Sequence, residues 1–305
     1  MRVLLTGAAG FLGSYVLQRL IDSGQEIAVL IRPDSDCWRI STPLDQVTRI
    51  TADFSAIEGA RRAISAFAPD TVLHLGWKGV AARDRNAPYQ PENLRWTTAL
   101  ARFSADIGVE TWLGLGSQAE YGPHRERISE NTPTKPTTLY GRIKLESGIN
   151  AQRICTQAGL RFAWIRVFST YGPKDNPDWM VPSLVLQLLR GQSPALTEAT
   201  QIWDFLYASD AAEAICRVAE EPKASGIFNL GSGEARSIRC VAETIRDLID
   251  PRLRLGFGQL RYREDQIMFL QTDVSRLREV VGWRPDTSLI DGLRQTIEWF
   301  REHAS

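Results

Sequence analysis

The chain has 305 residues, 43% of them hydrophobic, and its 36 basic residues are balanced by 36 acidic ones. This charge balance argues against a nucleic-acid or membrane-surface partner, and no apolar run approaches the roughly 20 residues of a membrane span. Four scattered cysteines and three scattered histidines argue against disulfides and against a metal site. The first residues lack the pattern of a signal peptide, so we expect a cytoplasmic protein. From the scattered cysteines and histidines we expect that it holds no metal.

Apolar runs typical of buried strands alternate with segments of helical periodicity along the first half of the chain. The expected strands are residues 2–7, 26–32, 47–53, 70–76, 110–117 and 161–168. The expected helices between them are 11–24, 56–67, 91–108 and 139–159. This alternation predicts an α/β fold, a Rossmann doubly wound parallel sheet with helices on both faces.

The alternation stops after residue 168. Residues 169–179 are rich in turn formers and predict a loop, and the last expected helix is 289–304. We therefore expect two domains. One is a Rossmann domain of residues 1–168 with return segments at about 200–235, and the other is a smaller α+β substrate-binding lobe of residues 169–199 and 236–305.

The stretch TGAAGFLGS, residues 6–14, lies between the first expected strand and the first expected helix. Its glycines, Gly7, Gly10 and Gly13, allow a sharp turn and a close approach to a pyrophosphate, while the N–H groups of the helix start face the anion. The spacing is GxxGxxG rather than the commoner GxGxxG, so a tight turn without a ligand is the alternative. Its place at the start of the alternation favours a dinucleotide site.

The end of the second strand indicates which dinucleotide is bound. An NAD site usually has an acidic residue here for the ribose 2′-hydroxyl, but this chain has Ile31 followed by Arg32. A guanidinium suits a 2′-phosphate, so we expect NADP as the preferred cofactor. NAD is the alternative, with Asp34 or Asp36 in the acidic role.

The third strand ends at a second candidate cofactor contact. Asp53 is placed to reach the adenine amino group, and Phe54 lies beside it. The alternative for Asp53 is to cap the helix that follows.

The segment LYGRIKLE, residues 139–146, places Tyr140 and Lys144 four positions apart on one face of a helix. A phenol has a pKa near 10, and a nearby ammonium favours the phenolate, which makes the phenol a usable acid–base group. Ser117 ends the preceding strand, where its hydroxyl would face the same crevice and stabilise a developing oxyanion. These three residues predict an alcohol–ketone oxidoreductase, with surface decoration of a helix as the alternative.

The motifs together resemble the extended short-chain dehydrogenase/reductase family, the group of nucleotide-sugar epimerases, dehydratases and reductases. The resemblance rests on TGAAGFLGS, SQAEYG (117–122), LYGRIK (139–144), RVFSTYGP (166–173) and DFLYASDAAEAI (204–215), and extends to residues 228–233 and 281–300. It implies a Rossmann domain with bound NAD(P) and a nucleoside-diphosphate sugar in the second lobe.

By position, the resemblance implies roles for individual residues. Ser117, Tyr140 and Lys144 match the family's catalytic residues. The candidate substrate contacts, besides Ser117, are Trp77, Ser169 and Arg263. The candidate cofactor contacts are Gly7, Gly10, Phe11, Leu12, Gly13, Arg32, Asp53, Phe54, Leu75, Gly76, Asn93, Tyr140, Lys144 and Phe168.

Three reactions are known on such a scaffold. The 4,6-dehydratases of this family share an acidic pair, or at least a glutamate, just after the serine or threonine. This chain has Gln118 and Ala119 at those positions, and Glu120 would face away on a strand-like path. A 4-epimerase needs a cofactor that stays bound, usually NAD. A 4-ketoreductase consumes reduced cofactor, which suits NADPH, so Arg32 favours a reductase acting on a 4-keto-6-deoxy sugar.

Two further alternatives are weighed on particular residues. A 3,5-epimerase/reductase would need an extra acid–base group, and the nearest candidates, His74 and Cys155, are expected to be packed structural residues. A non-catalytic NADP(H)-binding regulator would be expected to lack Tyr140 or Lys144. By analogy with the family, residues 91–108 and 139–159 are expected to pair in a homodimer.

Overall fold

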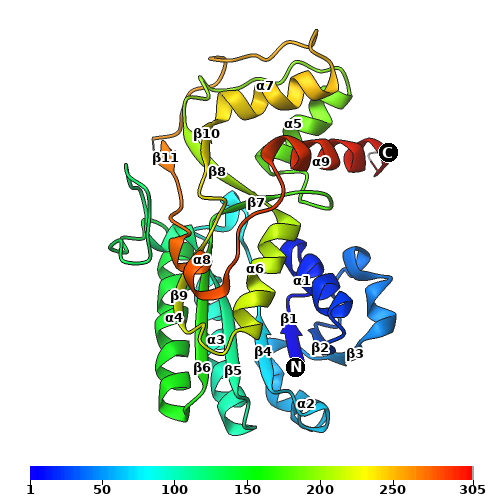
Figure 1. Cartoon of the computed structure of the whole chain (residues 1–305), viewed down its shortest axis with the longest axis vertical. Coiled ribbons are helices and arrows are strands. Elements are labelled where there is room, and N and C mark those ends of the chain that lie inside the picture. Colours follow the sequence, from blue (N-terminus) through cyan, green and yellow to red (C-terminus); the bar gives the residue numbers. More distant parts are fainter. Residues whose placement is uncertain (265, 304–305) are drawn as a thin grey trace.

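A seven-stranded parallel sheet forms the centre of the larger lobe. Its strand order is β3-β2-β1-β4-β5-β6-β9 (Figure 1). The computed structural model describes residues 1–264 and 266–303, without the side chains of Phe54 and Ser55. The strands are β1 (Arg2–Thr6), β2 (Glu26–Ile31), β3 (Thr48–Thr51), β4 (Thr71–His74), β5 (Thr111–Ser117), β6 (Arg161–Val167) and β9 (Gly226–Leu230). This order is that of a doubly wound Rossmann sheet, so the predicted fold class is confirmed.

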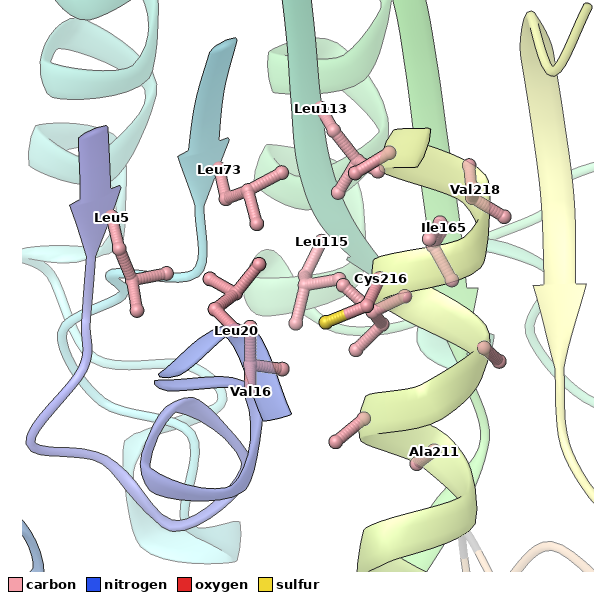
Figure 2. Packing of buried hydrophobic residues seen from close by; sticks show 14 of the residues in the cluster. Leu5, Val16, Leu20, Leu73, Leu113, Leu115, Ile165, Ala211, Cys216 and Val218 are labelled. Carbon is pink, nitrogen blue, oxygen red and sulfur yellow. The ribbon is translucent and has the colours of Figure 1, made fainter. Parts of the chain in front are cut away.

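Helices cover both faces of this sheet because successive strand residues point to opposite sides. Val3 and Leu5 pack toward one face, and Leu4 packs toward the other. Figure 2 shows Leu20 and Cys216, from two helices of the first face, turned toward Leu115 of β5. The first face carries α1 (Phe11–Asp22), α6 (Ala208–Glu220) and α8 (Ser275–Val281), and the second carries α2 (Arg61–Phe67), α3 (Gln90–Asp106) and α4 (Leu139–Ala158).

A smaller second lobe lies at one end of the large sheet (upper part of Figure 1). Its sheet is built on β8 (Ile202–Tyr207), which pairs in parallel with β7 (Ser169–Tyr171) and β11 (Phe269–Leu270) and antiparallel with β10 (Ala235–Ser237). A separate apolar cluster joins Tyr171 and Tyr207 of this sheet to the helices α5 (Met180–Leu189), α7 (Ile238–Ile249) and α9 (Leu289–His303). Within residues 1–264 and 266–303, no helix is long and apolar enough to cross a membrane.

Two elements differ from the sequence-based expectation. The predicted helix at 56–67 is instead a 3-10 segment, η3 (Phe54–Ala60), followed by the short α2, with the backbone leaving helical geometry at Ala56. The predicted loop at 169–179 begins with β7, which forms because a partner strand more than thirty residues later supplies its hydrogen bonds. Local composition cannot reveal such a partner.

The boundary between the two predicted domains is crossed by several segments. The chain returns to the large sheet at α6 and β9, inside the expected return segment. It returns again at α8, whose Leu277 belongs to the core of the large sheet although the sequence placed residues 236–305 in the second lobe. The division into domains therefore stays a proposal.

A buried carboxylate fixes the place where the two lobes meet. Asp204 of β8 is fully buried, and its oxygens accept from the backbone N–H groups of Ser232, Gly233 and Thr272 and from the Ser232 hydroxyl. Residues 231–233 follow β9 of the large sheet, whereas Asp204 belongs to the small one. One side chain thus ties the two sheets together.

We expect Asp204→Ala to lower the free energy of unfolding by about 3 kcal/mol, because several buried donors lose a charged acceptor together. Urea unfolding followed by circular dichroism measures this loss. The exposed Glu234→Ala in the same loop is the matched control. Equal effects of the two substitutions would show that Asp204 does not tie the lobes.

Candidate active site

The turn after β1 brings two strand ends into direct contact. Gly7 has φ +76°, and a Cβ placed there would lie 2.6 Å from the Gly76 amide nitrogen. A Cβ at Gly13 would collide with the Gly7 carbonyl oxygen, while the Gly10 amide donates to that oxygen at 3.0 Å. Only glycine allows this approach, and it leaves the start of α1 as bare backbone, suited to an anion.

A cavity begins at this turn and runs along the ends of β1, β2 and β4. Six of the residues predicted as ligand contacts line it, together with Ile31 at the end of β2 and Asp36 in the loop that follows. Its lining is Gly7, Ala8, Ala9, Gly10, Leu30, Ile31, Arg32, Ser35, Asp36, Leu75, Gly76, Trp77, Lys78 and Trp96. An elongated cavity between a glycine turn and two strand ends has the position of a dinucleotide site.

Charged residues of both signs lie at the rim beyond β2. Arg32 lines the cavity and pairs with the exposed Asp34 at 3.6 Å. Asp36 lines the same cavity. The rim therefore offers both a guanidinium for a 2′-phosphate and a carboxylate for a 2′-hydroxyl.

Several other predicted cofactor contacts are not among the residues that line this cavity. Phe11 and Leu12 begin α1, where Phe11 packs edge-on against Tyr15. The buried Asn93 of α3 uses its carboxamide to hold the backbone of Lys78, with contacts of 2.8 and 3.0 Å. Asp53 follows β3 and is half-buried, and the Phe54 side chain lies outside the described part of the chain. Cofactor contact by these residues stays a prediction.

Ser117, Tyr140 and Lys144 meet where β5 ends and α4 begins. The Thr138 side chain caps α4 by accepting from the Gly141 amide at 3.1 Å, and the Tyr140 amide donates to the Arg85 carbonyl oxygen at 2.7 Å. These contacts fix the first turn of α4 against the loop that follows β4. The catalytic residues that the sequence predicts are all buried, with at most 8% of each exposed.

The surroundings of Tyr140 keep its phenol protonated. Burial raises the pKa of Tyr140, and this is opposed by a side-chain hydrogen bond with Ser117 and by the positive charge of Arg85. We predicted Lys144 as the group that lowers this pKa, but here its Nζ donates to the Leu115 carbonyl oxygen at 2.8 Å and lies 5.9 Å from the Tyr140 ring. The pKa of Tyr140 is therefore raised, and the lowering that we predicted from Lys144 is not found here.

Lys144 is an ammonium group in a nearly dry place. Burial lowers the pKa of Lys144 to about 7, against the opposing effect of the Glu120 carboxylate. Its Nζ lies 3.6 Å from the centre of the Trp77 ring, a close cation–π contact. Its charge therefore changes near neutral pH.

Glu120 is a functional residue that the sequence reasoning missed. The chain after Ser117 does not continue as a strand but forms a short 3-10 turn, η5 (Gln118–Glu120). This turn points the Glu120 side chain back toward the Ser117 backbone. Its Oε1 accepts from the Ser117 amide at 2.8 Å and from the Trp164 indole at 3.0 Å, and its Oε2 pairs with Arg166 at 2.7 Å. Ser117 followed three residues later by Glu120 is the sequence pattern of a capping box, a signal that was present.

The remaining predicted contacts lie just after β6 and on the second lobe. Phe168 is buried against Tyr121, and the Ser169 hydroxyl accepts from the Trp203 indole at 2.6 Å. Arg263 is exposed on the second lobe, where its carbonyl oxygen accepts from the Gln266 amide at 3.1 Å. Whether Ser169 and Arg263 contact a substrate stays a prediction.

We expect Glu120→Gln to lower the free energy of unfolding by about 3–5 kcal/mol, because Arg166 would be left buried without its counter-charge. Urea unfolding measures the loss, with the exposed Glu126→Gln as control. The double substitution Glu120→Gln with Arg166→Met should recover part of it. A Glu120→Gln protein as stable as the control would contradict a structural role for this ion pair.

A second prediction concerns pH. Between about pH 7 and 10.5, Lys144 is neutral in the folded chain and protonated in the unfolded chain, so the folded state gains stability as pH rises through this window. Relative to Lys144→Met, the wild type should gain up to about 1.4 kcal/mol per pH unit there. Unfolding free energies measured at several pH values test this, with the exposed Lys223→Met as control, and a constant difference would refute it.

Residues 3–231 match the NAD dependent epimerase/dehydratase family. The chain is 28% identical to an uncharacterized UDP-glucose epimerase of Bacillus subtilis, over 98% of both chains, and 27% identical to the dTDP-glucose 4,6-dehydratase of Salmonella typhimurium, over 98% of this chain and 92% of that one. Its fold is similar to that of the UDP-glucose 4-epimerase of Thermus thermophilus in complex with NAD, with a TM-score of 0.88, 24% identity, and coverage of 99% of this chain and 100% of that one. The matched residues include the glycine turn and Ser117, Tyr140 and Lys144, and the chain is an enzyme of the NAD dependent epimerase/dehydratase family, within the extended short-chain dehydrogenases/reductases.

Proposed function

We propose that this enzyme is an NAD(P)H-dependent 4-ketoreductase of a nucleoside-diphosphate 4-keto-6-deoxy sugar. The observation that carries the proposal is the meeting of the buried Ser117, Tyr140 and Lys144 at the end of a sheet whose glycine turn fits a dinucleotide. A reductase needs a group that holds a proton and then gives it up. The homodimer and the sugar nucleotide as partner belong to the same proposal.

The residues present fit a nicotinamide dinucleotide because the glycine turn after β1 has no room for a side chain at Gly7 or Gly13, so phosphates could approach its backbone closely. When bound, the reduced nicotinamide supplies a hydride to the carbonyl carbon of the sugar. Tyr140 gives its phenolic proton to the carbonyl oxygen, which completes the alcohol. The Ser117 Oγ accepts from the Ala119 amide at 3.2 Å, which orients its own hydrogen for donation to that oxygen.

A dehydratase reaction is disfavoured although one relative carries that name. The two positions after Ser117 are Gln118 and Ala119, and neither can exchange a proton near neutral pH. The next residue, Glu120, has no solvent exposure and is engaged by Arg166 and Trp164. These three positions thus offer no acid to a leaving hydroxyl.

The choice of cofactor follows from the rim beyond β2. Arg32 lines the cavity where an NAD site commonly has an acid, which supports NADPH. Asp36 lines the same rim, and the neighbouring fold just described holds NAD, which supports NADH. We propose NADPH as the preferred donor because a guanidinium and a 2′-phosphate are complementary in charge and geometry.

A 4-epimerase with tightly held NAD is the second candidate. It is favoured by the name of the Bacillus subtilis relative and by the NAD-bound epimerase fold. The same Ser117, Tyr140 and Lys144 would serve it, with Tyr140 alternately taking and giving the proton. The two reactions differ in whether the cofactor is consumed.

We expect absorbance of NADPH to fall when the enzyme is mixed with dTDP- or UDP-linked 4-keto-6-deoxy sugars, and to fall more slowly with NADH. Interconversion of UDP-glucose with its C4 epimer, without net change in the cofactor, would instead identify an epimerase. Tight dinucleotide binding with neither reaction would identify a non-catalytic regulator. In the reductase outcome, Tyr140→Phe should lower kcat by about 10²–10⁴-fold while the dinucleotide Kd stays unchanged.

A further inference from the structure

Trp77 stands between the dinucleotide cavity and the catalytic pair. Its indole lines the cavity that starts at the glycine turn. The face of the same ring lies 3.6 Å from the Lys144 Nζ, and its plane meets the Tyr140 ring edge-on, with centroids 6.0 Å apart. One side chain therefore touches the space for a cofactor and both reacting groups.

The position of the indole is specified by the surrounding chain. Its Nε1 donates to the Oε1 of Gln90 at 3.1 Å. Gln90 is fully buried, and its own amide group donates to the carbonyl oxygens of Gly79 and Asp84 at 2.7 and 3.0 Å. Gln90 thus holds the indole and the loop after β4 together, and these hydrogen bonds fix the position of the indole.

This position of the indole conflicts with the prediction that Lys144 contacts the cofactor. An ammonium has three N–H groups, and one that donates to a cofactor ribose must turn one of them toward the cavity. Lys144 is only 5% exposed, one of its N–H groups donates to the Leu115 carbonyl oxygen, and the indole face lies 3.6 Å from its Nζ. Trp77 and the nicotinamide riboside half of a dinucleotide would therefore compete for the Lys144 ammonium. The adenosine diphosphate half would lie away from Trp77, along the part of the cavity formed by the glycine turn and the β2 rim.

We infer that Trp77 is a gate residue that must leave the Lys144 ammonium before the nicotinamide half of the cofactor can bind. This inference rests on the proposed dinucleotide site. Part of the affinity for the nicotinamide half is then spent on moving the indole, so the whole dinucleotide binds little more tightly than its adenosine half. A desolvated cation–π contact is worth about tenfold or more in an equilibrium constant, which sets the scale of the effect.

The test compares whole and truncated dinucleotides by isothermal titration calorimetry. The probes are NADP⁺ against 2′-phospho-ADP, and NAD⁺ against ADP, which lack the nicotinamide riboside; they are titrated below pH 7, where Lys144 is charged, into wild type, Trp77→Ala and Trp77→Phe. In Trp77→Ala we expect the dinucleotide Kd to fall about tenfold while the Kd of the truncated probe stays within about twofold. Trp77→Phe keeps a ring face for the ammonium but loses the Gln90 hydrogen bond, so its ratio should lie between the other two.

The possible results distinguish a failure of the Trp77 inference from a failure of the proposed dinucleotide site. A truncated probe that binds all three proteins alike shows that the site is folded. If the ratio of the two Kd values does not change in Trp77→Ala, or if the dinucleotide binds more weakly, the gate is refuted and the dinucleotide site stands. If neither probe binds the wild type, the proposed function fails and the gate fails with it.

Discussion

A carboxylate without any exposure to solvent governs the catalytic end of this sheet. Glu120 binds the Ser117 amide, the Trp164 indole and the Arg166 guanidinium at once. The three partners come from the end of β5 and from β6, so one charged group joins two strands where their carboxyl ends open into the crevice. Removing a buried charge from water is unfavourable, and the arrangement persists because the carboxylate is met by a counter-charge and by several donors.

The same carboxylate acts on the reacting groups through its field. Burial raises the pKa of Tyr140 and lowers the pKa of Lys144, and the Glu120 carboxylate adds to the first effect and opposes the second. Serine position, phenol acidity and ammonium charge are therefore coupled through one fully buried residue. Burial limits how far water can screen this coupling.

Much of this arrangement could be predicted from sequence, and the reasons for the rest are physical. The alternation of strands and helices specified the parallel sheet, since that pattern follows from local periodicity, and the fold class and family are confirmed. Glu120 was misplaced because a strand path was assumed where a capping-box turn forms. The contact of Trp77 with Lys144 joins positions more than sixty residues apart, and no local pattern encodes such a distance.

The glycine turn has a consequence for how this enzyme could change over time. Gly7 and Gly13 leave no room for even one methyl group, so the floor of the phosphate site cannot drift by substitution. Arg32, Asp34 and Asp36 lie beyond it on a surface where side chains can be exchanged independently of the fold. A lineage could therefore change its preference between the two nicotinamide dinucleotides by altering a few rim residues, while the glycine turn stays the same.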